Sequence, residues 1–189
     1  MLHTLVQFDF KLFHLINQEW THPYLDVFLS FMRSPFVWVP LYVFLISFFL
    51  FNFGKHGLIF KLTLIAFIVV ANLISSELIK KSVKRVRPCN EISIQNNRRT
   101  LVQCGTGYSF TSSHATNHFC FAIFYVLTTK RYIHRWRYLF LLWATIISYA
   151  QVYVGVHYPI DVMSGAIVGS LIGWGGAMIY NRSIYLRWV

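Results

Sequence analysis

Five long apolar stretches restrict this chain of 189 residues to a small set of folds. They occupy residues 36–53, 58–79, 114–129, 138–156 and 162–180. A helix of about 20 apolar residues crosses the hydrocarbon core of a bilayer, and a soluble core does not need several such stretches. The pattern therefore predicts an all-α, polytopic transmembrane helical bundle.

The N-terminal segment, residues 1–33, follows a different pattern. Apolar residues recur there at helical spacing among polar ones: Leu5, Phe8, Leu12, Leu15 and Ile16. This predicts an amphipathic helix in the membrane interface, followed by a second short apolar segment at 25–32. A sixth crossing built from these pieces stays open, so we expect five to six spans. The expected division is N-terminal helices in 1–33, a transmembrane domain in 34–181 and a cytoplasmic tail in 182–189.

The composition supports a membrane protein and excludes two other classes. Hydrophobic residues make up 56% of the chain and charged residues only 12%, whereas a soluble domain is about a quarter charged. Lys and Arg number 17 against 6 Asp and Glu, a formal charge of +11. The basic residues lie between apolar stretches and form no continuous stripe, which argues against nucleic-acid binding.

Basic residues in short loops set the expected orientation of the spans. The loop 130–137 carries Lys130, Arg131, Arg135 and Arg137 without an acid, so it should be cytoplasmic. Alternation then places the connection 80–113 outside. This connection is strongly basic, because it contains one acid, Glu91, and seven basic residues: Lys80, Lys81, Lys84, Arg85, Arg87, Arg98 and Arg99. Positive charge on the translocated side indicates an anionic ligand, or else a face that touches anionic headgroups.

Small residues and cysteines give structural expectations. Gly165, Gly169 and Gly173 recur every four residues and predict close approach of a neighbouring helix. Cys89 and Cys104 lie in the expected outer connection, where they either form a disulfide or stay as free thiols.

Three clusters of polar residues stand at the ends of spans on the same expected side of the membrane. In the first, a helix leaving the bilayer would place Lys80, Lys84 and Arg87 near one face before Pro88 ends it. Lys and Arg side chains directed at one place suit a phosphate. A headgroup anchor is the alternative.

The second cluster begins the span at 114. Ser112 suits a helix N-cap, and the free N–H groups of a helix start attract anions. His114 in the first turn could give a proton to a leaving oxygen, or could simply be an interface residue.

The third cluster pairs His157 with Asp161, four residues later. Burying a carboxylate at membrane depth costs free energy unless it has a partner, so we first interpret Asp161 as a functional residue. A carboxylate on one imidazole nitrogen fixes the tautomer and leaves the other nitrogen free to attack phosphorus; the alternative is a structural hydrogen bond. Together the clusters suit in-line phosphoryl transfer through a histidine. The chain lacks a carboxylate cluster for magnesium, so we expect no metal and no cofactor.

These motifs resemble those of the type 2 phosphatidic acid phosphatase (PAP2) superfamily, integral membrane lipid phosphatases that share their core with vanadium haloperoxidases. The signatures are Lys-x6-Arg-Pro, Pro-Ser-Gly-His and Ser-Arg-x5-His-x3-Asp. Lys80, Arg87 and Pro88 match the first, Ser112 and His114 the second, and His157 and Asp161 the third. The resemblance covers about residues 36–180.

The resemblance implies a role for each matched residue. His157 would be the nucleophile that forms a phosphohistidine, Asp161 would orient it, and His114 would be the acid for the leaving group. Lys80, Arg87, the Ser112 hydroxyl and the Ser113 backbone N–H would bind the phosphoryl oxygens.

The chain departs from the signatures at several positions. Ala150 and Gln151 stand where the third signature has Ser-Arg, so a neutral amide replaces a cation at the phosphate. Lys84 or Arg85 could supply the missing charge. Thr111 replaces Pro and Ser113 replaces Gly in the second signature.

The resulting prediction is a metal-independent membrane lipid phosphatase or diphosphatase of lipid metabolism in the cell envelope. Its site would face the periplasm or exterior of a bacterial inner membrane. Undecaprenyl diphosphate, phosphatidylglycerophosphate, phosphatidic acid and lipid A phosphates all fit as substrates, and diphosphates are slightly favoured. The expected partners are this lipid and the membrane lipids; the sequence gives no oligomeric state. The alternatives are a degenerate lipid-phosphate binding protein and, from Glu77 and Asn72, a small transporter.

Overall fold

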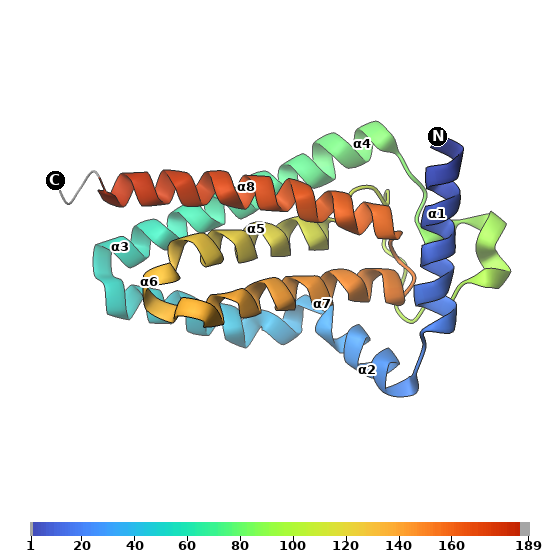
Figure 1. Ribbon diagram of the computed structural model, residues 1–189, viewed down its shortest axis with the longest axis horizontal. Helices are drawn as coiled ribbons and strands as arrows, with labels where there is room; N and C mark the ends of the chain where they lie inside the picture. The colour runs from blue at the N-terminus through green and yellow to red at the C-terminus, as the bar shows by residue number, and fades with distance from the viewer. Residues whose placement is uncertain (1, 186–189) are drawn as a thin grey trace.

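The computed structural model describes residues 2–185, and this part of the chain is helical without a strand (Figure 1). Short π and 3₁₀ turns join the α-helices. The α-helices are α1 Leu2–His14, α2 Pro23–Met32, α3 Val39–Leu73, α4 Lys80–Val83, α5 Ser113–Thr128, α6 Lys130–Ile133, α7 Leu139–Tyr153 and α8 Pro159–Tyr185. Helix α8 runs into the expected tail 182–189, of which residues 186–189 lie outside the described part.

Helix α3 is a hairpin of two apolar arms. The chain reverses at Gly54, whose φ of +47° an L side chain rarely adopts (Figure 1). The arms touch closely beside the turn: the rings of Phe49 and Phe60 stack with centroids 4.2 Å apart, and a Cβ on Gly57 would lie 1.9 Å from the Phe49 carbonyl oxygen. The apolar stretches 36–53 and 58–79 of the sequence are these two arms.

The bundle consists of the two arms of α3 together with α5, α7 and α8 (Figure 1). Helices α5 and α8 approach most closely, because Gly165, Gly169 and Gly173 face the α5 backbone. A Cβ on these glycines would lie 2.7, 2.1 and 2.3 Å from the carbonyl oxygens of Ser112, Thr116 and Cys120. The small-residue stripe predicted from the sequence is therefore confirmed.

Apolar side chains cover much of the outside of the bundle. Exposed examples are Phe44, Phe51, Leu62, Ile65, Val69, Leu142, Ile167, Leu171 and Trp174. Within the described residues two helices are long and apolar enough to cross a membrane, Pro35–Val83, which contains both arms of α3, and Pro159–Ser183. Such an exterior suits lipid better than water.

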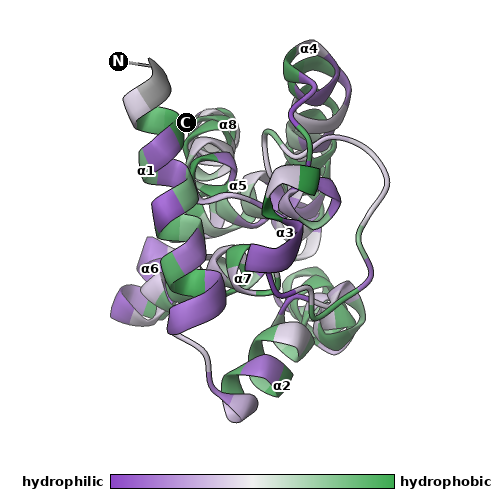
Figure 2. Ribbon diagram, turned by 90° about the vertical axis from the view of Figure 1, so that its right-hand side faces the viewer, coloured by the Kyte–Doolittle hydropathy of each residue, from purple (hydrophilic) through white to green (hydrophobic). Residues whose placement is uncertain are grey.

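The N-terminal helix lies across one end of the bundle, over the start of α8 (Figures 1 and 2). Leu5 and Phe8 of the apolar face expected for it are exposed, whereas Asp9 and Phe13 are buried, and the interfacial position of this helix stays a prediction. Asp9 can be buried because it finds polar partners on the bundle. The N-terminal helices share a core with the rest of the chain through Phe13, Ile16, Leu29, Tyr153, Val156 and Tyr158.

Candidate active site

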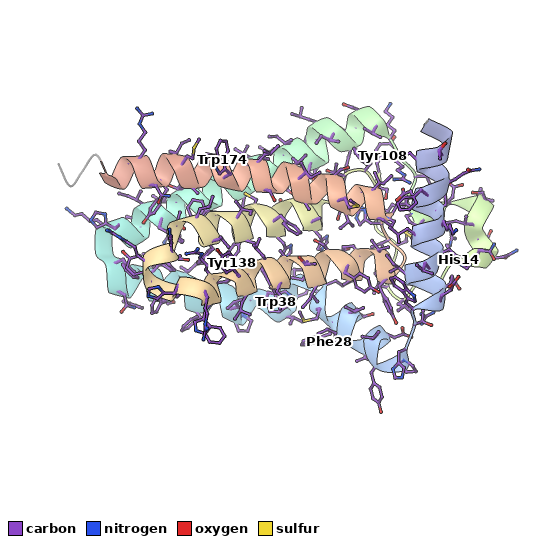
Figure 3. All side chains as sticks on the ribbon, in the orientation of Figure 1. His14, Phe28, Trp38, Tyr108, Tyr138 and Trp174 are labelled. Atoms are coloured by element: carbon purple, nitrogen blue, oxygen red, sulfur yellow. A yellow bond between two sulfur atoms is a disulfide. The ribbon has the colours of Figure 1, made fainter. Side chains whose placement is uncertain are left out.

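All three polar clusters lie at the end of the bundle that α1 covers. Lys80 begins α4, Ser112 precedes α5, and Asp161 is in the first turn of α8. The carbonyl of Asp161 accepts a hydrogen bond from the Ser112 backbone N–H at 3.0 Å, which ties two of these helix starts together. In Figure 3 the labelled Tyr108, from the same connection, marks this end.

The Lys80–Arg87 cluster is built differently from the sequence expectation. The helix ends at Val83 and does not continue to Pro88, because Lys84 adopts a left-handed conformation with φ +52°. Its N–H still bonds the Lys80 carbonyl, at 3.0 Å, and closes the last turn. Arg87 is therefore brought to the site by extended backbone, and Lys84 is exposed.

His157 is buried, and each of its two ring nitrogens has a polar neighbour that determines whether it carries the proton. Its Nε2 lies 3.1 Å from Nη1 of Arg87, which also donates to the Val156 carbonyl at 3.3 Å. Since a guanidinium only donates, Nε2 is the unprotonated nitrogen and Nδ1 carries the proton. The lone pair of Nε2 thus points toward the cationic side of the site.

The contact between His157 and Asp161 passes through Ser109, which the sequence reasoning did not assign. Nδ1 is 3.7 Å from the Asp161 carboxylate, beyond hydrogen-bond distance, but 3.3 Å from Ser109 Oγ. The Ser109 hydroxyl donates to Asp161, which also accepts from the Tyr158 backbone N–H at 2.9 Å. Burial lowers the pKa of His157 to about 4, against the opposing effect of Asp161, so the ring is neutral at pH 7.

The Arg85 guanidinium is held by two carboxylates, and the compensating role expected for it at the phosphate stays a prediction. The guanidinium bonds Asp161 at 2.7 Å and Asp9 of α1, and it lies 3.9 Å over the Tyr158 ring. Asp9 also accepts from the Ile160 backbone N–H at 2.9 Å. Burial raises the pKa of Asp9, and the two carboxylates raise that of Arg85 although its own burial opposes this.

The residues that depart from the second signature have hydroxyl partners. Thr111 and Ser113 both contact Ser75 Oγ, at 3.2 and 3.1 Å, and Ser113 also contacts Ser76 Oγ at 3.1 Å. Ser75 and Ser76 belong to a π-helical turn, Ile74–Ile79, between α3 and α4. Ser112 caps α5 as expected, its Oγ accepting from the Ala115 N–H at 3.4 Å.

His114 lies in the first turn of α5 above an aromatic stack. Its ring is parallel to that of His118, with centroids 6.2 Å apart, and His118 meets Trp143 edge-on at 4.8 Å. His118 and Trp143 also line a groove of about 340 Å³ between α3, α5 and α7, whose other walls include Leu64, Asn117 and Phe121.

Gln151 is completely buried, and both polar atoms of its amide lack a hydrogen-bond partner within the described residues. Such a group is costly unless a ligand or water satisfies it. Its backbone carbonyl accepts from the N–H groups of Val156 and His157, at 3.1 and 3.2 Å, and so holds the turn that presents the imidazole.

The connection between α4 and α5 is cross-linked beside Arg87. Cys89 and Cys104 form a disulfide with Cα atoms 5.9 Å apart. Among the described residues, no group of three or more His, Cys, Asp or Glu side chains is placed to hold a metal ion.

The family model of the PAP2 superfamily matches residues 61–185, which include every signature residue. The chain belongs to the PAP2 superfamily. Its homologues are lipid phosphatases, and it is a phosphatase-type hydrolase of the membrane.

Two relatives show how far the similarity reaches. The Lipid A 4'-phosphatase of Bacteroides thetaiotaomicron is 34% identical over 161 residues, covering 80% of this chain and 68% of the relative. The Undecaprenyl-diphosphatase of Sulfolobus acidocaldarius is 33% identical over 171 residues, covering 89% of this chain and 77% of the relative.

Two crystal structures have the same fold. LpxE of Aquifex aeolicus superimposes with a TM-score of 0.65 and 29% identity, covering 88% of this chain and 93% of LpxE. A PAP2-type phosphatidylglycerolphosphate phosphatase of Bacillus subtilis superimposes with a TM-score of 0.69 over 96% of this chain and 87% of its own; at 19% identity it shows the fold alone.

Proposed function

We propose that this PAP2 protein hydrolyses the phosphate monoester or diphosphate of a membrane lipid through a phosphohistidine formed on His157. The arrangement of the His157 ring carries the proposal. Nε2 has its lone pair beside the cation of Arg87, while Nδ1–H is held by Ser109 and, through it, by Asp161. This is the tautomer that a nitrogen nucleophile needs, and its lone pair becomes free to attack when Arg87 transfers its hydrogen bond to the phosphoryl oxygens of the substrate.

In the first step, Nε2 of His157 attacks phosphorus in line with the bond to the leaving oxygen. The N–P bond forms as the P–O bond breaks, and His114 supplies the proton that the leaving oxygen takes up. The positive charge of the modified imidazole is stabilised by Asp161. In the second step, water attacks the phosphohistidine, His114 takes its proton, and free phosphate leaves with His157 restored.

The phosphoryl oxygens would be held by residues from two of the three clusters. Lys80 and Arg87 supply charge, while the Ser112 hydroxyl and the N–H of Ser113 supply hydrogen bonds at the start of α5. Gln151, buried without a partner, would complete the set as a neutral donor. Preorganised donors of this kind stabilise the charge that develops in the transition state.

The substrate class follows from the relatives and from the groove. Relatives named for lipid A and for undecaprenyl diphosphate support a lipid phosphate or diphosphate. The groove beside His118 is largely apolar, so it suits an acyl or prenyl chain that enters sideways between α3, α5 and α7.

The proposed setting is a bacterial inner membrane with the site on the non-cytoplasmic side. The basic loop 130–137 lies at the opposite end of the bundle from the site, and the disulfide Cys89–Cys104 lies at the site end. Both suit an outward-facing site. The transmembrane catalytic domain would span 34–181, with 1–33 as its N-terminal cover.

The test is phosphate release from a panel of lipid phosphates and diphosphates by purified protein in detergent, with a chelator present. His157→Ala is the inactive control, and His134→Ala, an exposed histidine in the basic loop at the opposite end of the bundle, is the matched active one. Release that survives chelation and disappears in His157→Ala supports metal-independent histidine catalysis. Binding of the lipids without any release would instead make this a degenerate binding protein, and the mechanism would be wrong.

A further inference from the structure

Arg33 follows α2 and stands outside every signature of the family. Its backbone N–H bonds the Leu29 carbonyl at 3.2 Å and ends the helix. The neighbouring Met32 carbonyl accepts from the Trp38 indole N–H at 2.7 Å, which fixes this helix end to the bundle.

Aromatic contacts connect that helix end to the catalytic helix α5. Trp38 meets Trp143 edge-on, with centroids 5.3 Å apart, and Trp143 meets His118 at 4.8 Å. Figure 3 shows Trp38 beside α7, from which Trp143 comes. His118 is one turn from His114, the charge of Arg33 acts on His114, and the charge of Arg87 acts on Arg33. The aromatic contacts thus lead from the end of α2, where Arg33 stands, to the helix that carries His114.

The other arginines near the site have partners that explain their positions. Arg85 bonds Asp9 and Asp161, Arg99 bonds Asp26, and Arg98 bonds the carbonyls of Pro88 and Glu91. These guanidinium groups hold the structure together. Carboxylates neutralise the charges of Arg85 and Arg99, and two backbone carbonyls hold Arg98.

Arg33 differs, because within the described residues its side chain has neither a hydrogen bond nor an acidic partner. Its Nε is shielded from solvent, and it feels the charge of Arg87, which forms no ion pair with the described acidic residues either. Burial and the charge of Arg87 lower the pKa of Arg33, so the pair is unfavourable without an anion.

The third signature has an arginine at the position of Gln151, and Arg33 could supply the positive charge that this chain lacks there. At position 151 an amide stands where the resemblance places a cation on the phosphate, and the amide is itself unpartnered. We propose that Arg33 binds the phosphoryl group of the substrate together with Arg87 and replaces the cation absent at Gln151. This inference rests on the proposed function and adds to it a phosphate ligand from the N-terminal helices.

The experiment compares the wild type with Arg33→Ala, Arg33→Lys and Lys11→Ala, each purified in detergent. Lys11 is an exposed cation on α1 at the same end of the bundle, so its removal controls for loss of charge alone. Two quantities are measured: the inhibition constant of inorganic phosphate, and the rise in unfolding temperature that phosphate produces.

We expect Arg33→Ala to raise the phosphate inhibition constant about ten- to a hundred-fold, the effect of one charged hydrogen bond, and to abolish the rise in unfolding temperature. Arg33→Lys should recover part of both, because it retains the charge but not the fork. Lys11→Ala should stay within about two-fold of the wild type, as an exposed charge does.

An unchanged inhibition constant in Arg33→Ala would overturn the proposal. So would equal losses in Arg33→Ala and Arg33→Lys with a lower unfolding temperature in the absence of phosphate, since Arg33 would then be structural. A wild type that neither releases nor binds phosphate would overturn the proposed function itself. An active wild type with a normal Arg33→Ala variant would overturn only the role of Arg33.

Discussion

At the scale of single residues, the ionisation of His157 decides whether the proposed nucleophile exists. Only the neutral ring has a lone pair on Nε2, and burial lowers its pKa to about 4. Lowering the pKa of a base keeps it neutral at more acidic pH. The free protein should therefore hold His157 ready to react throughout the neutral range.

The prediction is that His157 stays neutral as the pH falls from 8 to about 5 and gains its proton only near pH 4. NMR of protein labelled with ¹⁵N-histidine measures this directly, with the His157 signal assigned from a His157→Asn variant. The measurement is independent of the substrate, whose own phosphate titrates near pH 6. Protonation of His157 between pH 6 and 7 would contradict the prediction.

Asp9 is a second residue whose effect can be separated from general stability. It holds one side of the Arg85 guanidinium while Asp161 holds the other. In Asp9→Asn, Arg85 loses a charged partner and is free to shift its bonds on Asp161, which orients His157 through Ser109. We expect kcat to fall about ten-fold or more, with little change in KM.

Asp26→Asn is the matched control for Asp9→Asn. Asp26 also fixes the N-terminal helices, by bonding Arg99 and the Tyr153 hydroxyl, the latter at 2.6 Å, but it does not touch Asp161. Both variants should lower the unfolding temperature, whereas only Asp9→Asn should lower kcat. Equal effects on kcat would mean that Asp9 acts through stability alone.

At the scale of elements, the close approach of α5 and α8 fixes the two helix starts that carry His114 and Asp161. Gly169→Ala places a Cβ 2.1 Å from the Thr116 carbonyl oxygen, so the helices must separate. We expect a loss of about 1–3 kcal/mol in the free energy of unfolding, as for other overpacked cores. Thermal unfolding in detergent measures it.

Gly175→Ala controls for the change in helix propensity, because Gly175 lies on the same helix. A Cβ there would meet only Phe67 Cε1 at 4.0 Å, an ordinary contact. This variant should keep the wild-type unfolding temperature or exceed it, since Ala favours a helix over Gly. Equal destabilisation by both variants would show that the α5–α8 contact tolerates an added methyl group.

The sequence predicts the elements and the motif residues better than it predicts their connections. Apolar stretches and signature spacing are local patterns, so the bundle and the clusters at its end could be read from them. Arg85 contacts Asp9 and Asp161 across 76 positions each, and no spacing reveals such a partner. The burial of Asp9 on α1 could not be predicted for the same reason, because its partners Arg85 and the Ile160 N–H lie far away in the sequence.

At the scale of the whole molecule, the number of membrane crossings determines on which side the N-terminus lies. Helix α1, α2 and the 84–112 connection all lie toward the site end, whereas the turns at Gly54 and 129–138 lie at the opposite end (Figure 1). Five helical segments connect these two ends: the two arms of α3, α5, α7 and α8. We therefore expect five crossings, with α1 and the active site on the same, outer side.

Labelling of single cysteines in intact cells by a membrane-impermeant maleimide tests this arrangement. The background is Cys89→Ser with Cys104→Ser and Cys120→Ala, checked for activity first, so that each introduced thiol is single and cannot exchange with the disulfide. Gln7→Cys on α1 and Ser93→Cys in the outer connection, both exposed, should be labelled, whereas Arg135→Cys in the basic loop should react only after the membrane is opened. Labelling of Ser93→Cys with protection of Gln7→Cys would mean a sixth crossing, and α1 could not then cover the site from outside. Labelling of Arg135→Cys with protection of Ser93→Cys would instead place the active site in the cytoplasm, where substrates of the outer leaflet could not reach His157.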